Sequence, residues 1–116
     1  VNCGHNPPLF VESNGRDRLL EEGCVGLGMF RDIPSMNVGT VDVTASSVLC
    51  CYTDGLIEQE NDLEVPFGTG RLLGLLRNHQ GQSLESVHRT IVAALDAFRG
   101  EVPPLDDTAM LSCRFS

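Results

Sequence analysis

The strongest structural signal in this chain is the stretch Val48-Leu49-Cys50-Cys51-Tyr52-Thr53-Asp54-Gly55, in which an apolar run ends in a carboxylate and a glycine. The run from Val48 to Thr53 is typical of a strand buried on both faces, which requires helices or a second sheet over it. Such a strand delivers Asp54 at the end of a sheet, where Gly55 lets the backbone turn sharply. The alternative is an Asp that only caps a turn, which is common in Asp-Gly pairs.

A second acidic motif, Asp106-Asp107-Thr108, lies between Pro103-Pro104 and the strand-like run 108–113. If the two runs are antiparallel neighbours, the end of the first and the start of the second lie at the same edge of the sheet. Asp54 and Asp106 then converge. Carboxylate oxygens are the ligands that Mg²⁺ and Mn²⁺ prefer. The pattern predicts a hard-metal site, with a turn or a solvated edge as the alternative for the second motif.

The first half of the chain contains several short extended segments. Leu9–Val11 is predicted to be a strand, Ser13-Asn14-Gly15 is a hairpin signal, and Arg18–Leu20 is predicted to pair back. The alternation of Val38–Val43 predicts a half-buried strand. The polar and acidic residues of Leu56–Glu64 predict a surface loop.

The turn Gly4-His5-Asn6-Pro7-Pro8 precedes the first of these strands. Glycine permits unusual backbone angles and the two prolines prevent helix formation. We expect His5 and Asn6 to fix the turn by side-chain hydrogen bonds rather than to touch a substrate.

Two helices are predicted in the second half. Leu72, Leu75, Leu76 and His79 have helical spacing, and this helix is expected to end near Gly81. Ser83 is suited to cap a second helix, and Gly100 to end it. The apolar face of the second helix is Leu84, Val87, Ile91, Ala94, Leu95 and Phe98. The order of strands, two helices and a strand predicts an α+β fold, with antiparallel β-sheets and the two helices packed on one face.

Composition describes an ordinary globular chain of 116 residues, with 41% hydrophobic and 21% charged residues. The formal charge is −8, and the eight basic residues are all Arg. An acidic surface repels phosphate backbones, so we expect no nucleic-acid partner. No apolar stretch approaches the ~20 residues of a membrane helix, so we expect no membrane partner.

The five cysteines are odd in number and contain no Cys-x-x-Cys pair. We expect them to be buried, reduced thiols of a cytoplasmic protein. A zinc site would need spaced Cys or His pairs, which are missing.

Five ordered blocks resemble the C-terminal half of a SpoIIE/RsbU-type serine phosphatase, within the metal-dependent PPM phosphatases. The blocks are Asn2–Pro8, Gly26-Leu27-Gly28, Tyr52–Glu58, Phe67-Gly68 with Arg71-Leu72-Leu73, and Asp106-Asp107-Thr108. The resemblance implies that the whole chain, residues 1–116, is the C-terminal portion of such a domain, and that its sheet and helices belong to an α-β-β-α sandwich.

The same resemblance implies a function. Asp54 and Asp106 would each coordinate Mg²⁺ or Mn²⁺ in a two-metal centre that activates a water. The substrate would be phosphoserine or phosphothreonine on a regulatory protein, of the anti-sigma-factor antagonist type.

The chain departs from the family pattern in three places. The N-terminal half, with its further acidic ligands, is absent, Ala45-Ser46-Ser47 replaces a usual Gly-Asp turn, and Ala109 replaces a usual Thr. The alternative function is therefore a non-catalytic, phosphatase-like module that binds a regulatory partner. A sheet without its neighbours would expose edges and apolar faces, so we also expect copies of the chain to associate.

Overall fold

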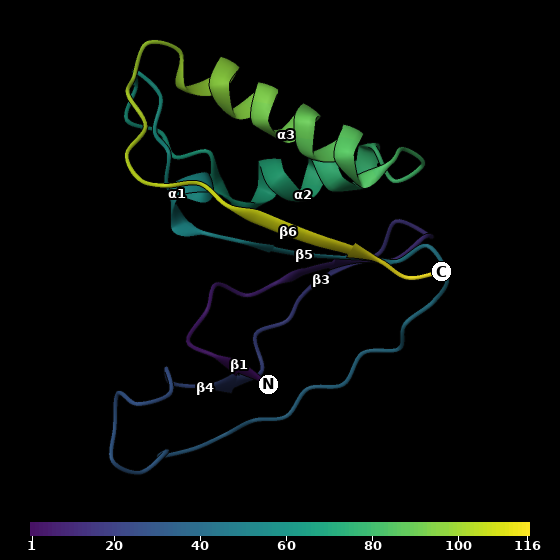
Figure 1. Ribbon diagram of the computed structural model, residues 1–116, viewed down its shortest axis with the longest axis vertical. Helices are drawn as coiled ribbons and strands as arrows, with labels where there is room; N and C mark the ends of the chain where they lie inside the picture. The colour runs from purple at the N-terminus through teal and green to yellow at the C-terminus, as the bar shows by residue number, and fades with distance from the viewer.

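The computed structural model describes all of residues 1–116 and contains a four-stranded antiparallel sheet in the order β3-β2-β5-β6. A separate parallel pair, β1-β4, lies away from the helices (Figure 1). The elements are β1 Asn2–Cys3, β2 Leu9–Val11, β3 Asp17–Leu19, β4 Gly23–Cys24, β5 Val48–Tyr52, α1 Asp54–Ile57, α2 Gly68–Asn78, α3 Leu84–Arg99 and β6 Met110–Arg114. Both long helices lie on one side of the main sheet, so the predicted arrangement of helices and sheet is confirmed.

Strand β5 occupies the centre of the sheet, and its side chains alternate between two different environments. Val48, Cys50 and Tyr52 are buried, and the last two join the core beneath the helices. Leu49 and Cys51 are only partly buried. The prediction of burial on both faces is therefore wrong for the second face, because both long helices pack on the first.

The face of the sheet away from the helices is called the open face here. The register Leu49↔Cys113 and Cys51↔Leu111 puts these four residues on it. Leu111 is 73% exposed and Cys113 is also exposed. The open face therefore carries apolar side chains that face solvent.

The two long helices form where the apolar spacing predicts them. Helix α2 buries Leu72 and Leu76, and α3 buries its apolar stripe of Val87, Ile91 and Leu95. Full burial of such a side chain contributes about 1.5–3 kcal/mol. These residues form the core together with the buried face of β2 and β5.

The ends of α3 also follow the predicted signals. The Ser83 Oγ accepts a hydrogen bond from the Ser86 backbone N–H at 3.2 Å. Gly100 ends the helix with a positive φ of 55°, and its N–H donates to the Asp96 carbonyl at 3.1 Å. A side chain at this φ is unfavourable, which explains the glycine.

Two segment predictions in the rest of the chain are wrong. Val38–Val43 forms no strand, and Val38 is 71% exposed, because no neighbouring strand offers it backbone hydrogen bonds. Leu56–Glu64 is not a surface loop throughout: Leu56 lies in α1 and is fully buried in the core. Gln59 is buried too, and its side-chain amide is satisfied inside the fold by donating to the Pro103 carbonyl at 3.2 Å. The hairpin from β2 to β3 is confirmed.

The cysteines are all free thiols, but the prediction that they are buried holds only for Cys50. Cys3 is exposed because it lies in the separate β1-β4 pair, and Cys113 is exposed because it lies on the open face of the main sheet.

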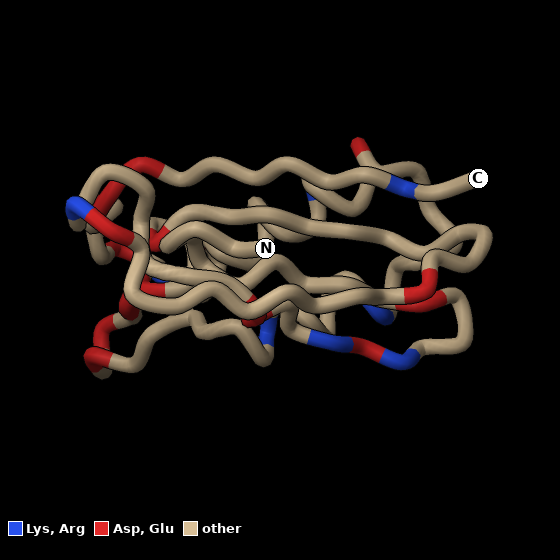
Figure 2. The backbone as a smooth tube through the Cα atoms, turned by 90° about the horizontal axis from the view of Figure 1, so that it is seen from below, with Lys and Arg blue, Asp and Glu red and all other residues tan.

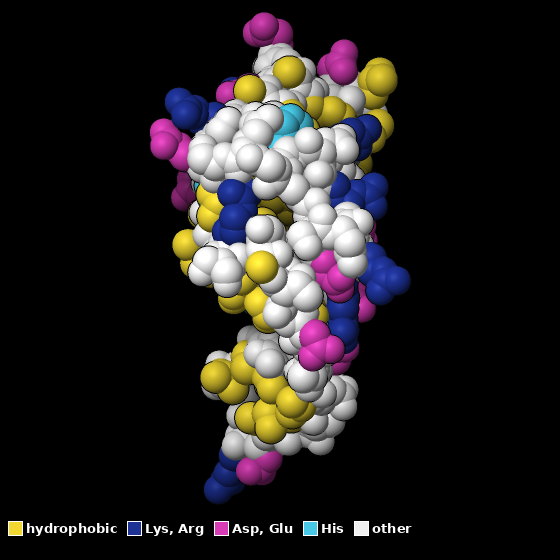
Figure 3. All heavy atoms as spheres, turned by 90° about the vertical axis from the view of Figure 1, so that its right-hand side faces the viewer, with side chains coloured by type: hydrophobic (Ala, Val, Ile, Leu, Met, Phe, Trp, Pro, Cys, Tyr) yellow, Lys and Arg dark blue, Asp and Glu magenta, His cyan; other side chains and the backbone are white.

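Exposed apolar side chains also gather in the segment that follows β4. Leu27, Met29, Phe30, Ile33 and Met36 are each about half exposed or more. Figure 3 shows hydrophobic side chains gathered on the lower lobe of the molecule, beyond a narrow waist. No helix in the structure is long and apolar enough to cross a membrane. The cytoplasmic location stays a prediction.

Candidate metal centre

Asp54 is the first residue of α1, directly after β5 and the connecting residue Thr53. Its carboxylate is exposed, at the end of the sheet where β5 finishes. The sequence prediction of a carboxylate delivered by the end of this strand therefore describes its position correctly.

The second acidic motif packs directly against the first at Gly55. A Cβ added at Gly55 would overlap the carbonyl oxygen of Asp107 and would lie 2.9 Å from that of Asp106. Only glycine leaves room for this approach. The backbone of the Asp106-Asp107 pair therefore lies beside the residue that follows Asp54.

Thr53 fixes the same approach by hydrogen bonds. Its hydroxyl donates to the Asp107 carbonyl at 3.2 Å and accepts from the Ala109 N–H at 2.9 Å. Its own N–H donates to the Ala109 carbonyl at 3.1 Å. Ala109 contributes only backbone atoms, so the replacement of a usual Thr there leaves this contact intact.

Asp106 has a local partner. Its Oδ1 accepts a hydrogen bond from the Asp107 N–H at 2.7 Å, which orients the carboxylate and leaves Oδ2 for a further ligand. Both Asp106 and Asp107 are exposed.

Asn6 is a member of this site that the sequence prediction missed. Its Nδ2 donates to Asp54 Oδ1 at 2.7 Å, so the prediction that the Asn6 side chain fixes its own turn is wrong, because that side chain contacts Asp54 just after the end of the neighbouring strand β5. The register of β2 and β5 contains the signal: Leu9 pairs with Cys50, and continuing this antiparallel register places Asn6 opposite Thr53, the residue next to Asp54.

The turn that carries Asn6 is itself held by side chains. Asn2 donates to the His5 carbonyl and accepts from the His5 N–H, each at 2.8 Å. His5 Nδ1 lies 2.7 Å from the Asn6 carbonyl oxygen, so the predicted role of His5 in the turn is confirmed. The Tyr52 hydroxyl donates to the Pro7 carbonyl at 2.9 Å and joins the turn to β5.

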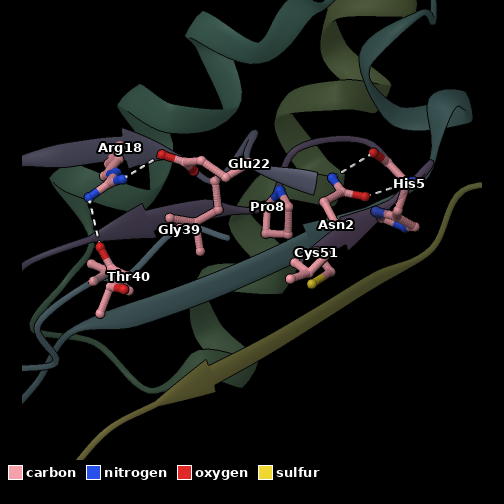
Figure 4. A pocket seen from close by; sticks show the side chains of 11 residues that line it. Asn2, His5, Pro8, Arg18, Glu22, Gly39, Thr40 and Cys51 are labelled. Atoms are coloured by element: carbon pink, nitrogen blue, oxygen red, sulfur yellow. Dashed lines mark hydrogen bonds and ion pairs between the residues drawn. The ribbon is translucent and has the colours of Figure 1, made fainter. Parts of the chain in front are cut away.

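A cavity of about 330 Å³ lies next to this turn, between the β1-β4 pair and the open face (Figure 4). Asn2, His5 and Cys51 line one side, and an ion pair of Arg18 and Glu22 at 2.8 Å lines the other. Neither Asp54 nor Asp106 lines it, so the cavity is separate from the candidate metal centre.

Acidic residues crowd the end of the molecule that holds α1 and the loop before β6 (Figure 2). Oxygen donors in a negative field suit Mg²⁺ or Mn²⁺. No group of three or more His, Cys, Asp or Glu side chains is arranged to hold a metal ion. The fit of Asp54 and Asp106 to such an ion therefore rests on the chemistry of their carboxylate oxygens alone.

A family model described as "Stage II sporulation protein E (SpoIIE)" matches residues 1–116. The chain belongs to the SpoIIE family. Phosphoserine phosphatase RsbP of Bacillus subtilis (strain 168) is a relative, 27% identical to this SpoIIE-family chain over 95 residues. The match covers 82% of the chain and 22% of RsbP.

The fold has a solved counterpart. The SiaA-PP2C domain of Pseudomonas aeruginosa superposes on this SpoIIE-family chain with a TM-score of 0.75 over 97% of the chain, at 24% sequence identity. The chain spans 44% of that domain structure. The predicted family and the α+β fold of PPM type are confirmed. The metal-ligand roles of Asp54 and Asp106 stay predictions.

Proposed function

We propose that this SpoIIE-family chain forms part of the catalytic centre of a Mg²⁺- or Mn²⁺-dependent protein serine/threonine phosphatase. Asp54 and Asp106 are the metal ligands in this proposal. The observation that carries it is the packing of the Asp106-Asp107 backbone on Gly55, directly beside Asp54.

Each residue around Gly55 has a distinct task. Asp54 and Asp106 supply carboxylate oxygens, and the remaining coordination positions go to water or to ligands outside residues 1–116. Asn6 orients the Asp54 carboxylate through its hydrogen bond, as partners of metal ligands commonly do. Thr53 holds the segment just before β6 against the end of β5 through its hydrogen bonds.

The charge of this region supports a role for divalent cations. A phosphorylated substrate carries negative charge, and the acidic end of the chain repels it. When bound, divalent ions would neutralise the charge of the phosphoryl group and activate a water molecule at neutral pH. Substrate binding and turnover should therefore both depend on the cation.

The family and its named member support a proposal for the substrate class. RsbP is a phosphoserine phosphatase. We infer phosphoserine or phosphothreonine on a regulatory protein, of the anti-sigma-factor antagonist type, as the substrate of this chain.

The test is hydrolysis of a phosphoserine peptide by the full-length protein, with and without Mn²⁺. We expect turnover only in the presence of the cation, and we expect the Asp54→Asn substitution to abolish this turnover. Asp62→Asn is the matched control, because Asp62 is an exposed acid in the loop after α1. A phosphatase rate that survives Asp54→Asn would contradict the proposal.

A second candidate, a non-catalytic module that binds a regulatory partner, is favoured by the turn before β5. Ser46 adopts a positive φ of 67°, a conformation that glycine accommodates more easily. Ser47 is fully buried, and its hydroxyl lies 2.8 Å from the Thr44 hydroxyl. Partner binding without metal-dependent turnover in the full-length protein would support this candidate.

A further inference from the structure

The small parallel pair β1-β4 brings two thiols together, apart from the candidate metal centre. Cys3 and Cys24 are register partners in this pair. The Cys24 thiol donates to the Cys3 sulfur at 3.7 Å. No other hydrogen bond in the structure joins two cysteines.

The backbone around the two thiols is tightly packed. A Cβ added at Gly23 would overlap the Asn2 carbonyl, and one added at Gly4 would lie 2.8 Å from the Gly26 nitrogen. The Asn2 N–H donates to the Glu22 carbonyl at 2.9 Å. The chain therefore holds the strands at close range on both sides of the cysteines.

This spacing is compatible with a disulfide bond. Neighbouring strands lie about 4.8 Å apart, within the roughly 4.4–6.8 Å that disulfides bridge between Cα atoms. Rotation of the Cys3 and Cys24 side chains is then sufficient to join the sulfurs.

The two thiols also differ in access. Cys3 is exposed and Cys24 is half-buried. Burial, followed by the hydrogen bond with Cys3, raises the pKa of the Cys24 thiol. An oxidant therefore meets Cys3 first, and Cys24 is the sulfur that resolves the intermediate.

We propose that Cys3 and Cys24 are a redox modification site, which forms a reversible intramolecular disulfide when a low-molecular-weight disulfide such as oxidised glutathione is present. The inference does not depend on the proposed phosphatase function.

The exchange proceeds in two steps. The Cys3 thiolate attacks one sulfur of the oxidant, breaks its S–S bond and releases one thiolate, which takes up a proton. Cys24 loses its proton to solvent and attacks the Cys3 sulfur of the mixed disulfide, which releases the second thiolate. The two protein thiols together lose two electrons, and one small disulfide gains them and is reduced to two thiols.

The bond would join β1 covalently to β4. The turn that begins at Asn2 continues through His5 to Asn6. Oxidation should therefore restrict the turn that carries Asn6, and the amides of Asn2 and His5 should exchange hydrogen more slowly.

Mass spectrometry after equilibration with oxidised glutathione tests the pairing. The intact chain should lose two hydrogen atoms. Trypsin cleaves after Arg16, Arg18 and Arg31, so Cys3 and Cys24 fall on separate peptides, and their cross-linked product identifies the bond. We expect the Cys3–Cys24 product to dominate over other cysteine pairings in the folded protein. After unfolding in guanidinium, it should no longer dominate.

Two variants complete the test. Cys24→Ser should abolish the loss of two hydrogens and leave a glutathione adduct on Cys3. Cys113→Ser removes the other exposed thiol and should leave the cross-link unchanged. Dominant cross-links through Cys113, or between chains, would overturn the proposal, as would the absence of a Cys3–Cys24 product from the folded protein.

Discussion

Asn6 Nδ2 donates a hydrogen bond to Asp54 Oδ1 at 2.7 Å, although the two residues are 48 positions apart in the sequence. The pairing of β2 with β5 creates this contact, because Leu9 lies opposite Cys50. The amide of Asn6 therefore limits where the carboxylate of Asp54 can point.

Asn6→Ala should weaken Mn²⁺ binding by the full-length protein about tenfold, a typical effect of removing a partner of a metal ligand. Calorimetric titration measures this. Asn14→Ala is the matched control, since Asn14 lies in the β2-β3 hairpin and bonds only within it. Equal Mn²⁺ affinity in Asn6→Ala and the unsubstituted protein would rule out the positioning role.

Gly55→Ala should lower the free energy of unfolding by about 1–3 kcal/mol, because the new methyl group forces the Asp106-Asp107 backbone away. Urea unfolding measures this. Gly74→Ala is the control: no atom lies within 4 Å of a Cβ there, and alanine favours the interior of α2 by about 0.5–1 kcal/mol. If both variants were equally stable, the tight contact at Gly55 would be wrong.

We predict that ionisation of the Tyr52 hydroxyl lowers the stability of the fold at alkaline pH. Burial, the largest cause, raises the pKa of Tyr52 above its ordinary value of 10.0. The folded state then binds this proton more tightly than the unfolded state. The resulting stabilisation is complete below the unfolded pKa, and it is lost as pH rises through the folded pKa.

Tyr52→Phe should therefore reduce the alkaline loss while costing about 1 kcal/mol at neutral pH, where the hydrogen bond to Pro7 is missing. Urea unfolding across the alkaline range compares the two proteins. Burial also raises the pKa of Cys50, so part of the loss should remain in both. An unchanged pH dependence in Tyr52→Phe would refute this assignment.

Copies of the chain should associate through the open face and the free edge of β6. Leu111 projects from this edge strand with 73% of its surface exposed. Leu111→Asp should shift the population towards the monomer in light scattering. Leu63→Asp, at a residue 75% exposed in the loop after α1, should not. A monomer at high concentration without any substitution would contradict the expectation.

The elements that the sequence predicts well are those whose signals are local. The spacing of Leu72 and Leu76 and the cap at Ser83 lie within single helices, so their pattern survives in the fold. The alternation of Val38–Val43 is equally regular, but a strand also needs a partner, and no strand pairs with this segment. A periodic pattern describes one segment and contains no information about its neighbours.

The candidate site divides in the same way. The positions of Asp54 and Gly55 at the end of β5 follow from the sequence, and the strand pairing of β5 with β6 explains why Asp106 lies nearby. The contact of Asn6 with Asp54 and the pairing of Cys3 with Cys24 depend on the register between strands distant in sequence. Such registers are set by the packed fold.

Titration of Mn²⁺ into the full-length protein and its Asp54→Asn, Asp106→Asn and Asp62→Asn variants tests whether Asp54 and Asp106 bind a metal ion. We predict that the first two substitutions each abolish or strongly weaken Mn²⁺ binding, because each removes a carboxylate ligand. Asp62→Asn removes the same charge from an exposed loop and should leave the affinity almost unchanged. Equal Mn²⁺ affinity in all four proteins would contradict a metal centre at Asp54 and Asp106.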